Sequence, residues 1–335
     1  MRHFLTTRGL SQGEFEALLA RGEEFRQGAE SHALGGLHVG LVFFDPSLRT
    51  RVSMEIAVSK LGGTPVALSV GGDAWAMEYE DGVVMDGAAA EHVREGAGVL
   101  GRYCDLLGVR SFPLGKDYAK DRREPVLTAF ARHSGVPVVN LESPLDHPCQ
   151  AMADAMTIRE RLGAAKGRKV LLTWAYHPKA LPMAVPNSFL LGASRLGVEF
   201  VLARPEGYDL DPEIVEAARS NARASGGSLT VTDDAEKAYD GASVVYGKSW
   251  GALADYGKPE AEAARRGQFK DWRVTEARMA RGRDAIFMHC LPARRNVVVD
   301  DAVLDGPRSA VLDEAENRLY AQQAILEWMM EEKSR

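Results

Sequence analysis

The segment Ser47-Leu48-Arg49-Thr50-Arg51 brings hydroxyl and guanidinium groups together. It follows an apolar run at residues 37–44 that predicts a buried strand, and it opens a helix expected at about residues 50–61. The start of a helix offers free N–H groups and a positive dipole end, which attract anions. With hydroxyls and a forked guanidinium beside them, the segment predicts a phosphate site. The alternative is an ordinary helix cap with solvated arginines.

A second candidate motif, His147-Pro148-Cys149-Gln150, lies between an expected strand and an expected helix. The His147 side chain can donate a hydrogen bond to an oxygen that gains negative charge during a reaction, and Gln150 can bind an amide-like group. The alternative is a histidine that caps the helix or lies at the surface.

A third motif, His289-Cys290-Leu291-Pro292, follows the strand expected at residues 285–288. The proline prevents a regular helix here, so backbone carbonyls can point at a cation. Two alternatives remain open: a strand end with a buried cysteine, or a reactive Cys290 thiol beside Arg294 and Arg295. We rank the thiol below the carbonyls because no paired general base is visible in the sequence.

The elements that position these motifs follow from the pattern of apolar residues. Ser11 and Glu14 form a capping box that opens the first helix. Predicted strands then alternate with predicted helices, which indicates parallel sheets flanked by helices. Because a helix at 148–161 joins two such series, we predict an α/β fold with two lobes, while residues 247–270 are expected to form a long loop. The strands are expected at residues 37–44, 65–70, 105–109, 136–140, 169–174, 198–202, 228–231, 242–246 and 285–288.

The composition limits the classes of protein to which the chain can belong. Its 335 residues suffice for two domains, and 45% apolar with 26% charged residues is typical of an ordinary globular protein. A net charge of −6 argues against nucleic acid or an anionic membrane as the main partner. Three cysteines without paired spacing argue against a disulfide framework and a zinc ribbon, so a cytoplasmic location is expected. We find no signal peptide and no apolar stretch near the ~20 residues of a membrane span.

Taken together, the three motifs resemble those of the aspartate/ornithine carbamoyltransferase family. The first reads Phe43-Phe44-x-Pro-Ser-x-Arg-Thr-Arg, and the resemblance extends from Leu37 to the terminal helix. It implies a carbamoyl phosphate-binding domain at residues 1–147, on which a C-terminal helix at 314–335 packs back, and an acceptor-binding domain at 148–313. It also implies a homotrimer whose active sites lie between the lobes and are shared between subunits. The implied chemistry belongs to arginine biosynthesis and needs no metal or other cofactor.

The resemblance also assigns roles to individual residues. Thr50, Arg110 and His147 polarise the carbamoyl carbonyl, and Gln150 holds the carbamoyl amide nitrogen. The backbone carbonyls of Cys290 and its neighbour hold the amine end of the acceptor, so Cys290 joins Arg110, His147 and Thr50 as a catalytic residue. Trp75 reaches into the site of the next subunit. The full set expected at carbamoyl phosphate is Ser47, Leu48, Arg49, Thr50, Trp75, Arg110, His147, Gln150, Cys290, Leu291 and Arg318.

The sequence differs from ordinary ornithine carbamoyltransferases at the positions where those enzymes bind the α-amino group of ornithine. Cationic and aromatic residues at 174–179 and 246–251 stand in place of the acidic and amide groups, which fits an α-amine masked by an acyl group. The chain therefore resembles the N-acetyl- and N-succinylornithine carbamoyltransferases. His177 and Lys248 are the preferred cationic pair for the acyl tail or the α-carboxylate, with Lys179 as a further cation. The expected acylornithine-binding set is Ala90, Glu142, Trp174, His177, Lys248, Arg294, Cys290 and Leu291.

Two positions bear on the acyl group. By resemblance, the acetylornithine enzymes carry a glutamate where this chain has Ala90 and a carboxylated lysine where it has Val298. A small, neutral Ala90 leaves room for a longer acid tail. The runs at 185–189 and 205–212 also look most like the succinylornithine enzymes. We therefore expect transfer of the carbamoyl group from carbamoyl phosphate to the δ-amine of N-succinyl-L-ornithine, giving N-succinyl-L-citrulline and phosphate. N-acetyl-L-ornithine as acceptor, and a noncatalytic phosphate-binding relative, are the alternatives.

Overall fold

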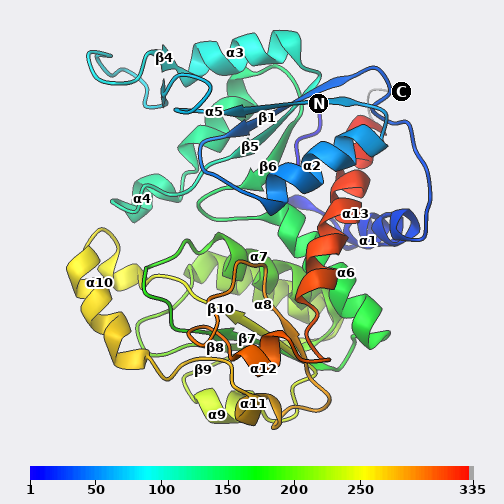
Figure 1. Ribbon diagram of the computed structural model, residues 1–335, viewed down its shortest axis with the longest axis vertical. Coiled ribbons are helices and arrows are strands. Elements are labelled where there is room, and N and C mark those ends of the chain that lie inside the picture. The colour runs from blue at the N-terminus through cyan, green and yellow to red at the C-terminus, as the bar shows by residue number, and fades with distance from the viewer. Residues whose placement is uncertain (332–335) are drawn as a thin grey trace. The chain divides into compact units, whose positions relative to one another are not determined.

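The computed structural model describes residues 1–331, and the chain divides into two compact units (Figure 1). Unit 1 contains Met1–Leu114, Ala119–Cys149 and the chain from Arg318 onward, and unit 2 contains Gly115–Tyr118 and Gln150–Asn317. Two of the boundaries fall inside helices, α6 (Pro148–Leu162) and α13 (Val311–Met330).

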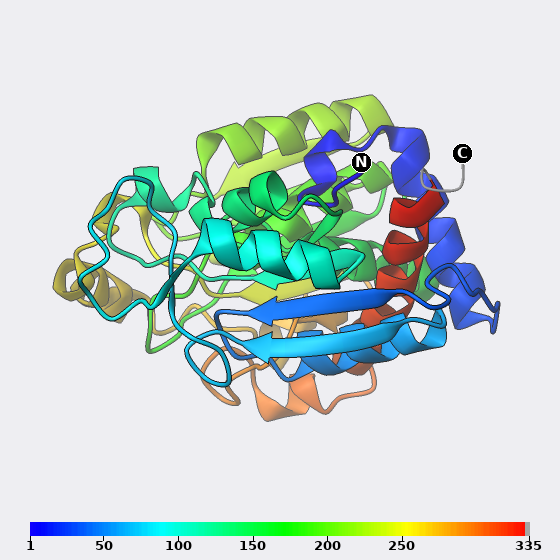
Figure 2. The ribbon, with the colours of Figure 1, turned by 90° about the horizontal axis from the view of Figure 1, so that it is seen from above.

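Unit 1 is built on a four-stranded parallel sheet in the order β2-β1-β5-β6. Figure 2 shows its first two strands in blue, side by side. Because β2 lies on one side of β1 and β5 on the other, the carboxyl ends of β1 and β5 form a topological switch point, where open α/β sheets usually bind ligands. The strands are β1 His38–Phe43, β2 Thr64–Ser69, β5 Leu106–Arg110 and β6 Val138–Glu142, with a separate short pair, β3 Met77–Glu78 and β4 Glu91–His92.

The helices of unit 1 begin with the predicted capping box. The Glu14 N–H donates to the Ser11 hydroxyl at 3.2 Å, and the Ser11 N–H donates to the Glu14 carboxylate at 2.9 Å, which confirms the prediction. Arg21 of α1 donates to Glu327 of α13 at 2.5 Å, so the end of α13 lies against α1 within unit 1 (Figure 1). The helices are η1 Thr7–Gly9, α1 Gln12–Arg26, α2 Arg49–Lys60, α3 Val93–Tyr103 and α5 Pro125–His133, with α4 Tyr118–Asp121 at the boundary of the units.

Unit 2 contains a five-stranded parallel sheet in the order β11-β10-β7-β8-β9. Its core is aromatic, since Phe189 lies on Tyr246 with ring centroids 4.0 Å apart and Trp174 lies on Tyr208 at 4.6 Å. With β8 and β10 on opposite sides of β7, a second switch point lies at the carboxyl ends of β7 and β10. The strands are β7 Lys169–Trp174, β8 Glu199–Ala203, β9 Ser228–Thr232, β10 Val244–Lys248 and β11 Ile286–Met288.

Helices complete unit 2 and correct one prediction. The long loop expected at residues 247–270 is wrong, because a helix, α10, forms within it. The α10 segment has no apolar side chain larger than alanine after its proline, but it has proline at its first turn, acids near its start and arginines at its end, all of which favour a helix. The helices are α7 Ala184–Ala193, η2 Ser194–Leu196, α8 Pro212–Ser225, α9 Ala235–Ala238, η3 Leu253–Asp255, α10 Pro259–Arg266, η4 Gly267–Phe269, α11 Glu276–Met279 and α12 Asp301–Leu304.

The predicted α/β fold with parallel, helix-flanked sheets is confirmed. The terminal helix starts at Val311, slightly earlier than expected, and its expected end at 332–335 lies outside the described residues. Among residues 1–331, no helix is both long and apolar enough to cross a membrane.

Candidate active site

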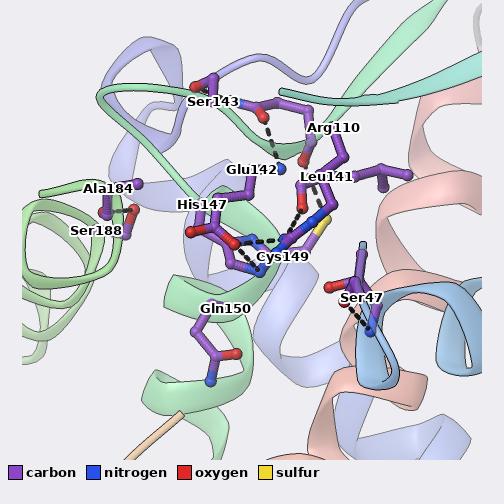
Figure 3. Close-up of polar contacts among 12 residues, drawn as sticks. Ser47, Arg110, Leu141, Glu142, Ser143, His147, Cys149, Gln150, Ala184 and Ser188 are labelled. Atoms are coloured by element: carbon purple, nitrogen blue, oxygen red, sulfur yellow. Dashed lines mark hydrogen bonds and ion pairs between the residues drawn. The ribbon is translucent and has the colours of Figure 1, made fainter. Parts of the chain in front are cut away.

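The switch point of unit 1 carries the predicted phosphate segment. Arg110, the last residue of β5, is in register with Phe43, the last residue of β1, and the N–H of Phe44 donates to the Arg110 carbonyl at 2.9 Å. The Ser47 hydroxyl accepts a hydrogen bond from the Thr50 N–H at 3.1 Å (Figure 3). Ser47 therefore satisfies an amide at the start of α2, and the segment leaves the sheet next to Arg110.

A buried ion pair joins Arg110 to Glu142, the last residue of β6 (Figure 3). The Nε2 atom of His147 lies 3.7 Å from the same carboxylate oxygen. Glu142 is expected among the acylornithine-binding residues, and the structure places it in unit 1 with Arg110 and His147. Its φ of 137° lies in a region that favours glycine, and backbone strain of this kind concentrates at functional sites.

Arg318 of α13 completes the cluster in unit 1. Its Nη2 atom donates to the Thr50 hydroxyl at 2.6 Å. Arg110 and Arg318 are only 6% and 3% exposed, and the Nε–H of each is buried without an acceptor among residues 1–331. A buried donor without an acceptor costs about 1–3 kcal/mol, and more when it is charged. Such an arrangement is suited to bind an anion.

Burial and the arginine charges of this cluster shift the pKa values of its titratable side chains. Burial lowers the pKa of His147 well below its ordinary value, and the positive charges of Arg318, Arg110 and Arg49 lower it further. Burial likewise lowers the pKa of Arg318. His147 is therefore a neutral imidazole that can donate one hydrogen bond, and the positive charge of the cluster comes from its arginines. Burial raises the pKa of the nearby Cys149 thiol to about 12, so this thiol stays protonated.

The switch point of unit 2 brings together four of the residues that are expected to bind the acceptor. Lys248, the last residue of β10, is in register with Trp174, the last residue of β7. The Arg294 Nε–H donates to His177 Nε2 at 2.9 Å, and Lys248 is close enough to lower the pKa of His177. Arg294 is exposed, whereas His177 and Lys248 are buried.

His177 is neutral, which corrects the prediction of a cationic His177–Lys248 pair. Arginine can only donate hydrogen bonds, so Nε2 of His177 is unprotonated and the ring proton lies on Nδ1. That proton is donated to the Lys179 carbonyl at 2.9 Å, and in this tautomer Nδ1 cannot also accept from the Lys179 N–H, which lies 3.0 Å from it. Burial lowers the pKa of His177, as do the charges of Arg294, Lys248 and Arg266. The cations at this switch point are therefore Arg294 and Lys248, and His177 orients Arg294.

Trp174 has a packing role in unit 2. Its side chain is 1% exposed, lies in the aromatic core and donates its indole N–H to the Trp250 carbonyl at 2.9 Å. Because its side chain is buried and its N–H is hydrogen-bonded within the protein, Trp174 stabilises the end of β7 by packing in the core.

Gln150 belongs to a buried polar network in unit 2 that sequence reasoning missed. Its Nε2 atom donates to Asp154 at 2.8 Å and to Glu314 at 3.0 Å. Asp154 lies four residues after Gln150 on α6, a spacing that places both side chains on one face of a helix, and this signal was available in the sequence. The contact with Glu314, 164 residues away, was not.

The loop after β11 has the irregular backbone that its Leu-Pro pair predicts. The His289 N–H donates to the Glu314 carboxyl at 2.8 Å, and the Leu291 N–H donates to His289 Nδ1 at 2.9 Å. Leu291 has φ of 53°, in the left-handed region, and its peptide bond to Pro292 is cis. Cys290 and Leu291 are half-buried.

The remaining predicted residues lie outside these clusters. In unit 1, Trp75 is 68% exposed, Leu48 is 75% exposed, and Ala90 is exposed in the segment before α3. The Ala90 N–H donates to the Ala76 carbonyl at 3.2 Å, next to the paired strands β3 and β4. Val298, in unit 2, is buried. Among residues 1–331, no group of three or more His, Cys, Asp or Glu side chains is placed to hold a metal ion.

Two family models cover most of the chain. The carbamoyl-P binding domain of aspartate/ornithine carbamoyltransferases matches residues 2–160, and the Asp/Orn binding domain matches residues 183–329. The chain belongs to the aspartate/ornithine carbamoyltransferase family. The family predicted from the sequence motifs is thus confirmed.

Individual relatives place the chain in the acylornithine branch of this family. It is 47% identical to the N-acetylornithine carbamoyltransferase of Xanthomonas campestris pv. campestris over 97% of each chain. It is 38% identical to the N-succinylornithine carbamoyltransferase of Bacteroides fragilis over 95% of this chain and 96% of that relative. Overall identity is therefore higher to the acetyl enzyme than to the succinyl enzyme. The runs at residues 185–189 and 205–212 predict the opposite order.

A solved structure bears on the same question. It is an N-acetyl-L-ornithine transcarbamylase variant in which one glutamate is replaced by alanine, complexed with carbamyl phosphate and N-succinyl-L-norvaline. This carbamoyltransferase superposes on the chain with a TM-score of 0.96 and 47% identity, covering 98% of this chain and all of the other.

Proposed function

We propose that this protein transfers the carbamoyl group of carbamoyl phosphate to the δ-amine of an N-acylornithine, giving an N-acylcitrulline and phosphate. The observation that carries the proposal is the pair of buried guanidinium groups, Arg110 and Arg318, whose Nε–H donors have no acceptor among residues 1–331. They lie with the Ser47–Thr50 segment at a sheet position that favours ligand binding.

In the proposed reaction, the neutral δ-amine attacks the carbamoyl carbon, and the bond from that carbon to the phosphate oxygen breaks. Thr50, Arg110 and neutral His147 donate hydrogen bonds to the carbonyl oxygen as it gains negative charge. Each well-placed donor of this kind is worth roughly 10²–10³-fold in rate. The phosphate leaves among Ser47, Arg49 and the Thr50 hydroxyl, and one proton of the amine passes to solvent or to the phosphate itself.

The acceptor site of the proposal is the switch point of unit 2. Arg294 and Lys248 supply two positive charges for a carboxylate, and His177 holds Arg294 in place. An acylated α-nitrogen has no charge, so it needs no acidic partner there. The backbone carbonyls of Cys290 and Leu291 are assigned to the amine end of the acceptor.

Two observations favour different acyl groups. The higher overall identity to relatives named N-acetylornithine carbamoyltransferase favours N-acetyl-L-ornithine. Ala90 favours N-succinyl-L-ornithine, because by resemblance it replaces the glutamate of the acetyl enzymes. We infer that this is the glutamate whose replacement by alanine accompanies bound N-succinyl-L-norvaline in the solved relative. Since one charged side chain can exclude an acid tail whatever the rest of the chain resembles, we propose N-succinyl-L-ornithine as the preferred acceptor.

A side-by-side assay tests both levels of the proposal. Formation of the carbamoylated product and of phosphate is measured with N-succinyl-, N-acetyl- and unmodified L-ornithine at equal concentrations. Turnover with acylated acceptors and little with ornithine is the expected result, with the highest kcat/KM for N-succinyl-L-ornithine. A higher kcat/KM for N-acetyl-L-ornithine would assign the acetyl activity instead. Carbamoyl phosphate binding without turnover of any acceptor would leave a noncatalytic binding protein.

We also propose a homotrimer in which Trp75 contributes to a neighbouring site. Leu48, the N-cap residue of α2, and Val52 and Ile56 within the helix have exposed apolar side chains at a spacing of four residues, with Trp75 exposed nearby in sequence. Mixing Trp75→Ala subunits with Arg49→Ala subunits should restore some sites and hence some activity. Verified mixed trimers without recovered activity would argue against shared sites, and a monomeric protein in solution would argue against the assembly.

A further inference from the structure

Two buried carboxyl groups that the proposed reaction does not use converge on the side-chain amide of Gln150. Gln150 Nε2 donates to Asp154 Oδ1 at 2.8 Å and to Glu314 Oε1 at 3.0 Å, all within unit 2. The exposed fractions of the two acidic residues are 1% and 0%. Because a carboxamide has two N–H donors, these contacts use both of them.

The oxygen of the same carboxamide is left for another partner. Gln150 Oε1 is buried and has no hydrogen-bond partner among residues 1–331. Turning the amide over would bring this oxygen against two carboxyl oxygens and leave the N–H groups without acceptors, so the two acids fix its orientation. A buried oxygen that is held in this way can accept a hydrogen bond from a ligand N–H.

Glu314 has a second set of contacts that links Gln150 to the loop after β11. Its Oε1 atom also accepts from the Tyr246 hydroxyl at 3.2 Å, and its Oε2 atom accepts from the His289 N–H at 2.8 Å. Burial and the neighbouring Asp154 raise the pKa of Glu314 well above its usual range, which reduces the repulsion between the two acids. One side chain thus holds both Gln150 and the residue that precedes Cys290.

We infer that Asp154 and Glu314 are positioning residues that aim the Gln150 carboxamide oxygen at the amide nitrogen of bound carbamoyl phosphate. The inference rests on the proposed function, because it takes carbamoyl phosphate as the ligand. Neither acid contacts the ligand in this arrangement. Their loss lets the Gln150 amide rotate, so the protein loses recognition of the carbamoyl N–H but keeps its contacts with the phosphate.

Acetyl phosphate gives the matching probe, since it carries a methyl group where carbamoyl phosphate carries the amine. The dissociation constants of both compounds and of inorganic phosphate are measured by titration calorimetry at low temperature. The ratio of the acetyl phosphate to the carbamoyl phosphate constant should fall roughly tenfold in Gln150→Ala, Asp154→Ala and Glu314→Leu. Affinity for inorganic phosphate should stay within about threefold.

Two control variants separate positioning from general damage to the fold. Asp154→Asn keeps an acceptor oxygen and should retain most of the wild-type ratio. Thr157→Val removes a buried 2.9 Å hydrogen bond between Asn317 and Thr157, which joins the same two helices about one turn away. It should leave the ratio unchanged, because it does not touch Gln150.

A double-mutant cycle decides the outcome. Adding Asp154→Ala or Glu314→Leu to Gln150→Ala should cause no further loss of the ratio, because the acids act through Gln150. Three results would overturn the inference. They are additive losses in the double variants, folded single variants that keep the wild-type ratio, and a wild type that does not discriminate between the two compounds. If circular dichroism shows that Glu314→Leu is unfolded, the Asp154→Ala cycle decides. Failure of the proposed function is a separate result: discrimination in binding without carbamoyl transfer to any acylornithine.

Discussion

Units 1 and 2 both place their candidate ligand groups at the carboxyl ends of strands beside a switch point, yet the groups are held differently. In unit 1, Arg110 and Arg318 are almost fully buried, and burial with nearby arginines keeps His147 neutral. In unit 2, Arg294 is exposed at the surface and a neutral His177 accepts its hydrogen bond.

This difference follows from the groups that each unit is proposed to bind. A phosphate that is taken out of water needs several buried charged donors, because each lost contact with water must be replaced. A carboxylate at the end of a flexible side chain is satisfied by one oriented arginine and a lysine. We therefore expect substitutions of the arginines in unit 1 to affect catalysis more than substitutions at the switch point of unit 2, which should affect binding of the acceptor.

The largest effect is expected for Arg49→Ala in unit 1. Loss of a guanidinium at the start of α2 should lower kcat/KM for carbamoyl phosphate by about 10³-fold while the fold stays intact. Arg51→Ala is the matched control, because Arg51 forms an exposed pair with Glu55 at 3.1 Å, and its loss should change kcat/KM by less than about threefold. Near wild-type kcat/KM in Arg49→Ala would remove Arg49 from the site.

Arg110→Lys should be the next most severe change. Lysine keeps the charge but has no planar fork, so it cannot hold Glu142 and a ligand oxygen together. We expect a loss of roughly 10²-fold in kcat/KM for carbamoyl phosphate. Steady-state kinetics would check this, and a lysine variant with wild-type rates would show that charge alone suffices in unit 1.

Ala90→Glu tests the choice of acceptor. A glutamate would place a negative charge where an acid tail is proposed to lie, and the ratio of kcat/KM for N-succinyl- to N-acetyl-L-ornithine should fall by at least roughly tenfold. The KM for carbamoyl phosphate should change little. Because Val298 is not a lysine, a complete switch to the acetyl substrate is not expected. An unchanged ratio would separate Ala90 from acyl specificity.

The smallest effect is expected at His177, and it depends on pH. The pKa of His177 lies below its ordinary value of 6.5, so the neutral form that accepts from Arg294 persists at pH 6.5 and above. The KM for acylornithine should therefore rise only when the pH falls well below 6.5, where protonation sets His177 against Arg294 and Lys248. His177→Leu should raise this KM about tenfold, whereas His177→Gln should keep an acceptor for Arg294 and remove the pH dependence. A rise in KM centred at or above pH 6.5 would contradict the neutral histidine.

The sequence predicted the two sheets and the residues of unit 1 more fully than those of unit 2. Ser47, Arg49 and Thr50 are close together in the chain, and the family resemblance added Arg110, which follows a predicted strand whose carboxyl end meets theirs at one edge of a parallel sheet. The charge state of His177 was out of reach, since it depends on burial and on Arg294, which lies 117 residues away.

Two further features of unit 2 differ from the prediction, for different reasons. The partnership of Gln150 with Glu314 spans 164 residues and depends on which faces of α6 and α13 meet. The sequence predicts a loop where α10 forms because this segment has no apolar side chain larger than alanine after its proline. Its start and end residues carried the information instead.

The positive φ of Glu142 has a consequence for how this chain can change over evolutionary time. A glycine at position 142 would relieve about 1–3 kcal/mol of backbone strain, offset by about 0.5–1 kcal/mol of extra chain entropy in the unfolded state. The same replacement would remove the carboxylate that pairs with Arg110. A buried guanidinium left without its partner costs about 3–5 kcal/mol, so Glu142→Gly should lower the melting temperature and the activity together. Selection for stability and selection for turnover therefore both favour glutamate at this position, and the strained backbone is tolerated because the Arg110 pair outweighs it.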